Sequence, residues 1–140
     1  MYKYTNSYNF AMLDDTLQRE TFRVLFNRTR FKRAQLDALL VRRYALENHL
    51  KLKDVLSMRD KRTSLGSMER SAFQAEGVIA GSIATLILAL GLGLVSSNVI
   101  ESIPRIASLL EQSTVRELNG EELTRFLALV SAMLHSASHK

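Results

Sequence analysis

The residues of this chain best suited to do chemistry are its lysines and arginines, whose clustering predicts contact with phosphates. Residues 19–62 hold thirteen of the nineteen bases and only five acids, a net charge of +8, whereas residues 63–140 hold five bases and seven acids. Clustered cations are favoured by polyanions such as nucleic acids or anionic membrane surfaces. The predicted nucleic-acid-binding residues are Arg19, Arg23, Arg28, Arg30, Lys32, Arg33, Arg42, Arg43, Lys51, Lys53, Arg59, Lys61 and Arg62.

Signals of catalysis or of a metal site are weak, and the sequence predicts a protein that is not an enzyme. His135 and His139 are four residues apart, as helical metal ligands are, but no cysteine or obvious third ligand accompanies them. The pair Asp14-Asp15 suits a helix start better than acid–base catalysis. No glycine-rich loop with a phosphate-binding lysine is present. We therefore expect no catalytic residue, no metal and no cofactor.

The elements that position the cations are predicted to be helices, so the expected fold class is all-α. A single proline and a hydrophobic content of 46% favour helices around a packed core. We expect an extended arm over residues 1–12, a basic helix-turn-helix pair over 13–62 and a compact apolar helical bundle over 63–140. Without cysteine there is no disulfide framework, and the polar first ten residues do not have the pattern of a secretory signal.

The basic segment is predicted to contain two helices, from Asp14 to Arg33 and from Ala34 to Met58. A stripe of arginines spaced 4, 7 and 3 residues apart should follow one face of the first helix, opposite an apolar face. This stripe consists of Arg19, Arg23, Arg30 and Arg33. The apolar face of the second helix is predicted from Leu36, Leu39, Leu40, Leu46 and Leu50.

The C-terminal bundle is predicted to contain at least three helices. The first should span Met68 to Leu90, with Ser67 as its N-cap, and end near two glycines. The second should begin at Val99 behind an Asn98/Glu101 capping box, and the third should follow residue 119. Subunit contacts are predicted from the third helix and from aromatic residues of the arm. These residues are Leu123, Phe126, Leu127 and Val130, with Tyr2, Tyr4, Tyr8 and Phe10.

An uncharged run within the bundle allows two interpretations. Val78–Val95 is 18 residues without a charge, long enough to be considered as a membrane span, and basic residues precede it. Ser82, Thr85 and two glycines interrupt the run, and the amphipathic helix predicted over 120–135 needs an apolar partner. We therefore expect the run to be a buried bundle helix, with a single-pass membrane protein spanning 78–98 as an alternative.

Sequence-specific DNA reading is a second alternative. Leu50–Met58, a turn and Ser64–Val78 have the rough dimensions of a helix-turn-helix, with Ser67, Arg70 and Gln74 able to face a groove. No cluster of Asn or Gln accompanies Arg70, so base-specific contacts have little support in the sequence. Ser64–Arg70, leading into a long apolar helix, also resembles small archaeal helix-turn-helix regulators.

The order of parts resembles the coat proteins of filamentous archaeal viruses. In that family an N-terminal arm and a basic helix-turn-helix wrap double-stranded DNA, while a C-terminal helical bundle packs into the filament wall. The resemblance implies these roles for the arm Tyr2–Phe10, the arginine stripe and the bundle over Gly77–Ser136. It implies a sequence-independent duplex-packaging protein in a virion or host cytoplasm, with self-association or a paralogous subunit. The strength of the apolar run departs from the family pattern and would suit lipid contact at the bundle in an enveloped particle.

Overall fold

The structure, a computed structural model, describes residues 12–59 and 63–115 and the single positions 121, 124, 125, 128 and 132. Every regular element in these residues is a helix, which confirms the all-α class. The predicted arm, apart from residue 12, lies outside the described residues. The helices are α1 (Met12–Gln18), α2 (Glu20–Phe26), α3 (Arg33–Glu47), α4 (Leu52–Ser57), α5 (Leu65–Gly91) and α6 (Ser97–Val115).

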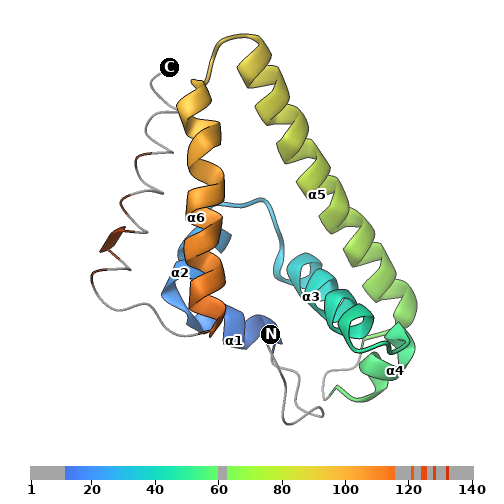
Figure 1. Cartoon of the computed structure of the whole chain (residues 1–140). Helices are drawn as coiled ribbons and strands as arrows, with labels where there is room; N and C mark the ends of the chain where they lie inside the picture. The colour runs from blue at the N-terminus through green and yellow to red at the C-terminus, as the bar shows by residue number, and fades with distance from the viewer. Residues whose placement is uncertain are drawn as a thin grey trace.

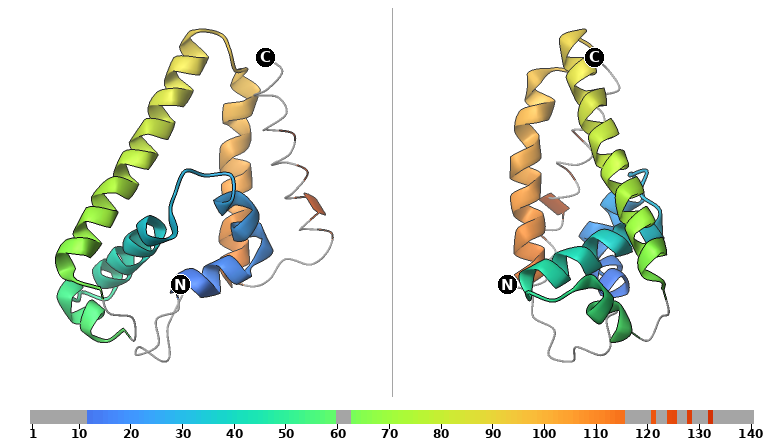
Figure 2. Two further views of the ribbon diagram at one scale, coloured as in Figure 1. Left: turned by 180° about the vertical axis from the view of Figure 1, so that it is seen from behind. Right: turned by 90° about the vertical axis from the view of Figure 1, so that its right-hand side faces the viewer.

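The two longest helices, α5 and α6, are joined at one end and diverge toward the other (Figure 1). Helices α3 and α4 pack at the foot of α5, and α2 packs against α6. Helix α1 contacts both α2 and α3, and so connects the helices that pack on α6 with those that pack on α5. The views from behind and from the side show the same arrangement (Figure 2).

The first predicted helix is two helices, and neither extends to Arg33. The backbone of Arg19 is extended, with ψ of 125°, and separates α1 from α2. Helix α2 ends at Phe26 because the Thr29 hydroxyl forms hydrogen bonds with backbone groups that would otherwise continue the helix. The Thr29 hydroxyl donates to the Phe26 carbonyl and accepts from the Phe31 N–H, so residues 27–32 form a turn.

The second predicted helix is also interrupted, between α3 and α4. His49 adopts a left-handed conformation with φ of 55°. Its N–H donates to the Leu46 carbonyl, and the N–H of Leu50 donates to the Ala45 carbonyl. This is a Schellman motif, which ends helices and usually has glycine at the left-handed position. The helix ends without a glycine or proline, so its end was not predicted.

Helix α5 confirms the prediction of a long helix that begins near residue 68 and ends beside two glycines. Its N-cap is Ser64 rather than Ser67, because the Ser64 hydroxyl accepts the Ser67 N–H at 3.1 Å. Its end is a second Schellman motif, with Gly93 at φ of 72°. Helix α6 begins at Ser97 and continues through Pro104, so the start predicted behind an Asn98 cap was wrong.

The core lies between α3 and the first half of α5, and small residues dominate it. Ala38, Ala45, Ala72 and Ala75 are all buried, together with Val41 and its neighbours Val55, Leu56, Met68 and Met12. Alanines at these positions let the two helix backbones approach closely. The predicted leucine face of the second helix is therefore wrong in part, and Leu46 is 71% exposed. The α3–α5 contacts cross the predicted domain boundary at residue 62.

The second half of α5 is exposed among the described residues. Ile79, Ile83, Ile87 and Leu88 are all exposed, and about 6% of the most apolar 18-residue window of α5 is buried. Within the described residues, the expectation that the uncharged run is buried in a compact bundle was therefore wrong; most of its predicted partner over 120–135 lies outside them. The physical reason is length: α5 has 27 residues and α3 has 15, so α3 covers the first half of α5 and does not reach its apolar second half.

Candidate nucleic-acid interface

The strongest concentration of free cations lies on α2 and the turn that follows it. Thr21–Leu36 contains five bases and no acid. Arg23, Arg28, Arg30 and Lys32 are exposed, and none of the four pairs with an acid in the described part of the chain. We call these four residues the α2–α3 cationic segment. The turn around Thr29 interrupts the helix, so Arg28, Arg30 and Lys32 lie in the non-helical connection between α2 and α3.

The predicted arginine stripe does not exist as one face of a helix. Arg19 lies at the break between α1 and α2, and Arg23 lies within α2. Arg30 lies in the turn, and Arg33 begins α3. The predicted spacing assumed an unbroken helix, which the extended backbone of Arg19 excludes. Arg19 is also half-buried, and its Nη1 atom is buried without a hydrogen-bond partner among the described residues.

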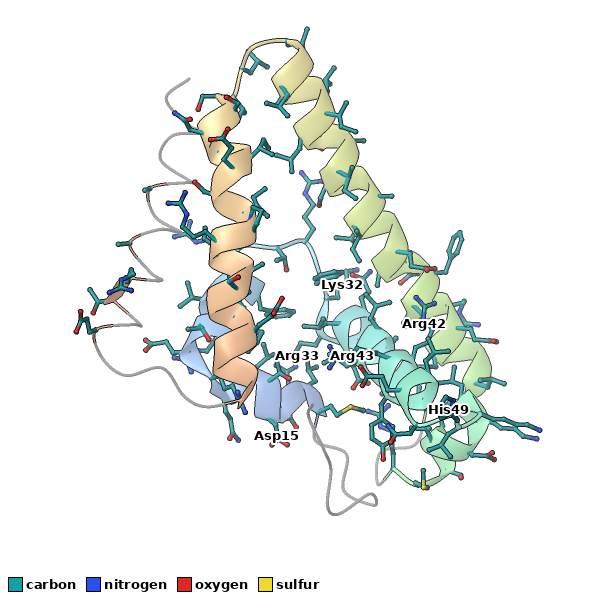
Figure 3. All side chains as sticks on the ribbon, in the orientation of Figure 1. Asp15, Lys32, Arg33, Arg42, Arg43 and His49 are labelled. Carbon is teal, nitrogen blue, oxygen red and sulfur yellow. The ribbon has the colours of Figure 1, made fainter. Side chains whose placement is uncertain are left out.

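Two of the predicted phosphate-binding arginines pair with acids of other helices. Arg33 contacts Asp14 of α1 at 2.7 Å, and Arg42 contacts Glu76 of α5 at 3.0 Å. All four side chains are at least one-third exposed, and such pairs contribute about 0–1 kcal/mol to stability. Each of these two arginines therefore has a carboxylate beside it that compensates its charge, unlike the four residues of the α2–α3 cationic segment. Figure 3 labels Lys32 just before α3, Arg33, Arg42 and Arg43 on α3, and His49 just past its end.

Arg59 is not available to a phosphate polymer, and its assignment as a phosphate-binding residue was wrong. Its Nη2 atom donates to both carboxylate oxygens of Asp37, at 2.9 and 3.1 Å, and its side chain is 4% exposed. The pair links the residue after α4 to α3. Each of the two charges contacts the other in place of water. The sequence contains no signal for this pair, because the two residues are 22 positions apart.

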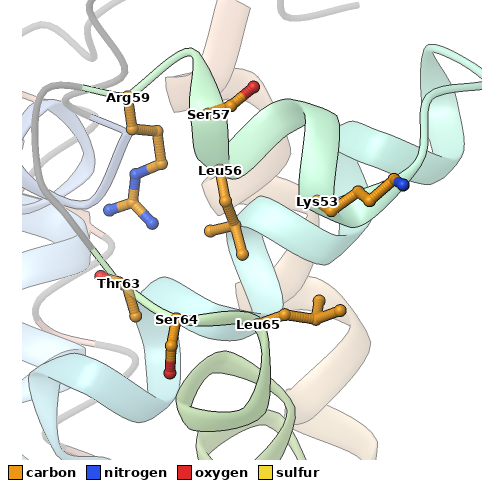
Figure 4. Close-up of a pocket in the computed structure, with 7 residues that line it drawn as sticks. All are labelled: Lys53, Leu56, Ser57, Arg59, Thr63, Ser64 and Leu65. Carbon is orange, nitrogen blue, oxygen red and sulfur yellow. The ribbon is translucent and has the colours of Figure 1, made fainter.

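A cavity of about 690 Å³ lies beside Arg59, between α4 and the start of α5. Leu56, Arg59 and Thr63 line it, and Lys53 and Ser64 stand farther along its wall (Figure 4). Within the described residues the Nε and Nη1 atoms of Arg59 are buried without a partner.

The remaining predicted bases form a weaker group around α3 and α4. Arg43, Lys51 and Lys53 are exposed, whereas Lys61 and Arg62 lie outside the described residues. His49 is exposed beside them. Within residues 12–59 and 63–115, no three acidic or histidine side chains gather in a geometry that would hold a metal ion.

The predicted helix-turn-helix corresponds to α4, a connection over residues 58–64 and α5. Arg70 and Gln74 are exposed on α5, and Ser67 is half-buried. Helix α4 has only six residues, and the connection is longer than the three or four residues usual for this motif. The geometry therefore favours a helix junction that supports the core over a DNA-binding helix-turn-helix.

The predicted subunit-contact residues lie outside the described part of the chain. They are Tyr2, Tyr4, Tyr8, Phe10, Leu123, Phe126, Leu127 and Val130. Their assignment stays a prediction. Comparison of the chain with models of protein families, with curated proteins and with solved structures found no match.

Proposed function

We propose that this chain is a sequence-independent binder of duplex nucleic acid, in the first instance DNA, that acts as a repeated structural subunit. The observation that supports this most is the α2–α3 cationic segment. Its four side chains are exposed, lie within ten residues of one another and are free of acids in the described structure. Phosphates at regular spacing are the polyanion that such a group neutralises best.

The aromatic residues of the same region favour a duplex over a single strand. Phe22, Phe26 and Phe31 are all half-buried, so they do not form the exposed stacking platform that single-strand binders use. The exposed groups are cations, which contact phosphates and carry little sequence information. Sequence-independent binding along the backbone follows from this composition.

The size of the segment sets the expected salt dependence. Four phosphate contacts give a slope of log K against log salt of about −3.6. Affinity should then fall on the order of 10²-fold between 50 and 200 mM salt. The thirteen contacts expected from the sequence alone would give a far steeper loss, so the measured slope distinguishes the four-residue segment from the whole basic third of the chain.

The test compares two variants that remove the same amount of charge. In the first, Arg23, Arg28 and Arg30 are replaced by Gln; in the second, Arg33, Arg42 and Arg125 are replaced, each of which pairs with an acid. Fluorescence anisotropy on a labelled duplex of random sequence is read at several salt concentrations. We expect the first variant to bind at least tenfold more weakly, with a slope reduced by about 2.7, and the second to keep most of its slope. Equal losses in both variants, or no loss in the first, would contradict the proposal.

The second candidate function is attachment to a membrane through α5. In the described part of the chain, α5 is the one helix long and apolar enough to span a bilayer, with a mean hydropathy of 1.7 over 18 residues. The hydroxyls of Ser82 and Thr85 donate to the carbonyls of Val78 and Gly81 within the helix, so they do not oppose lipid contact. This removes one of the sequence arguments against a span.

A flotation assay separates the two candidates. Purified protein is mixed with vesicles containing phosphatidylserine, with neutral vesicles and with duplex DNA, each without detergent. Binding to DNA with no flotation supports the nucleic-acid function. Flotation with both vesicle types, together with no retention of DNA, would replace it with membrane attachment.

A further inference from the structure

The connection between α2 and α3 is ordered by hydrogen bonds although it is not helical. At least five of the six backbone N–H groups of residues 27–32 donate a hydrogen bond within the described structure. The first three of these groups donate to carbonyls of α2. Those of Phe31 and Lys32 donate to side chains instead. The second half of the connection therefore depends on two polar side chains, those of Thr29 and Gln35.

Thr29 holds the middle of the connection. Its hydroxyl donates to the Phe26 carbonyl at 2.8 Å and accepts the Phe31 N–H at 3.2 Å. It thereby links the last residue of α2 to a half-buried phenylalanine just before α3. A hydroxyl has one hydrogen to donate, and that of Thr29 is already used within the protein. The Thr29 side chain is exposed among the cations and yet has no donor left for a phosphate.

Gln35 holds the end of the connection. Its Oε1 atom accepts the Lys32 N–H at 2.9 Å, and the residue is buried, with 8% of its surface exposed. The bond joins the residue before α3 to the first turn of that helix. Because Gln35 is held in the protein interior, the backbone of Lys32 is fixed relative to α3.

The backbone that these two residues fix carries three of the exposed cations. Arg28 and Arg30 lie on either side of Thr29, and Lys32 carries the N–H that Gln35 accepts. A flexible loop has to become ordered when it binds, and the lost conformational entropy weakens the complex. A connection that is ordered in the free protein avoids this loss.

We propose that Thr29 and Gln35 are positioning residues of the nucleic-acid interface. They order the connection before binding, so that Arg28, Arg30 and Lys32 meet the phosphates of a duplex without an ordering step. The inference rests on the proposed binding of duplex nucleic acid. Neither residue carries a charge, so each affects the affinity and leaves the number of neutralised phosphates unchanged.

The first test measures the affinity and the salt dependence of Thr29→Val, which keeps the shape of threonine and removes the hydroxyl. Fluorescence anisotropy on a labelled duplex of random sequence should show binding about five- to tenfold weaker at fixed salt, with an unchanged slope of log K against log salt. Thr29→Ser keeps the hydroxyl and should bind as the wild type does. Thr16→Val is the matched control, because it removes a hydroxyl that donates to the Met12 carbonyl at 2.7 Å within α1.

The second test asks whether the order of the connection is the cause. In the free protein the Phe31 N–H of Thr29→Val has lost its acceptor, so it should exchange with deuterium about tenfold faster than in the wild type. Gln35→Met removes the acceptor of the Lys32 N–H and keeps an unbranched side chain of similar length. It should show the same pattern as Thr29→Val, weaker binding with an unchanged slope, while circular dichroism shows that both variants fold.

The outcomes separate this inference from the function on which it rests. A wild-type chain that does not bind duplex DNA overturns both. If the wild type binds and Thr29→Val binds equally tightly, the positioning role alone is overturned. Equal weakening by Thr29→Val and Thr16→Val also overturns it, because the hydroxyl within the connection would then have no special effect. A reduced salt slope in Thr29→Val overturns it as well, since the variant would have lost a phosphate contact.

Discussion

Arg59 and Asp37 form an ion pair in which a single nitrogen, Nη2, serves both carboxylate oxygens, and the two side chains are 4% and 9% exposed. The pair joins the end of α4 to α3, next to the core residues Val55 and Leu56. A buried pair of this kind is costly to break but contributes little over apolar groups of the same shape. Its role is therefore to fix the position of α4.

Breaking this pair should be among the most destabilising changes in the chain. We expect Asp37→Ala to lower the free energy of unfolding by about 3–5 kcal/mol, because it leaves the buried Arg59 guanidinium without its acid. The double variant Asp37→Leu with Arg59→Met should recover most of that loss. Urea unfolding followed by circular dichroism measures both. Asp14→Ala, which breaks an exposed pair, is the control and should cost at most about 1 kcal/mol.

The left-handed residue at the end of α3 predicts a stabilising substitution. His49 has φ of 55°, where a side chain costs about 1–2 kcal/mol and glycine costs nothing. After the greater entropy that glycine has in the unfolded chain is subtracted, His49→Gly should raise stability by about 0.5–1 kcal/mol. Asn48→Gly is the control, since Asn48 has φ of −104° and gains nothing from glycine. Equal melting temperatures for the two variants would contradict the prediction that the backbone is strained at His49.

The cap of α5 predicts different outcomes for two serines three positions apart. Ser64→Ala removes the oxygen that accepts the Ser67 N–H and should cost about 0.5–2 kcal/mol. Ser67→Ala keeps that backbone N–H and should change stability by less than about 0.5 kcal/mol. Chemical denaturation of the two variants decides whether α5 begins at Ser64 or at the cap predicted from the sequence.

The close approach of α3 and α5 predicts strong sensitivity to side-chain size. Ala75 is fully buried in the interface, so Ala75→Leu should lower stability by about 1–3 kcal/mol through overpacking. Ala80→Leu adds the same atoms on an exposed part of the same helix and should be nearly neutral. Similar losses in the two variants would indicate that Ala80 is also covered in solution.

Periodicity over long segments predicted the class and the largest helix of this fold. The pattern over Met68–Leu90 predicted the long helix that the structure confirms as α5, and the predicted end beside two glycines is confirmed, with Gly93 at a left-handed position. The breaks at Arg19 and at His49 were missed because they depend on local hydrogen bonds and on residues that are ordinary helix formers or neutral in helices. The core face of α3 was missed because alanines form it, and alanine has little weight in a hydrophobic pattern.

The candidate interface could be predicted only in outline. Composition located the cluster of cations in residues 19–62. Among its residues the structure describes seven of them as exposed and without an acidic partner, the four of the α2–α3 cationic segment and also Arg43, Lys51 and Lys53. Which arginines pair with acids depends on the packing of distant helices, as with Arg42 and Glu76 or Arg59 and Asp37. Sequence spacing contains no record of such contacts.

The return of α6 to α2 has a consequence for how the molecule opens. This contact joins segments at least 71 positions apart in the sequence, and among the described helices it is much smaller than the contact between α3 and α5. Loop closure of that length makes it a late and weakly held event in folding. Backbone amides of α6 should therefore exchange with deuterium well before those of α3 and the first turns of α5.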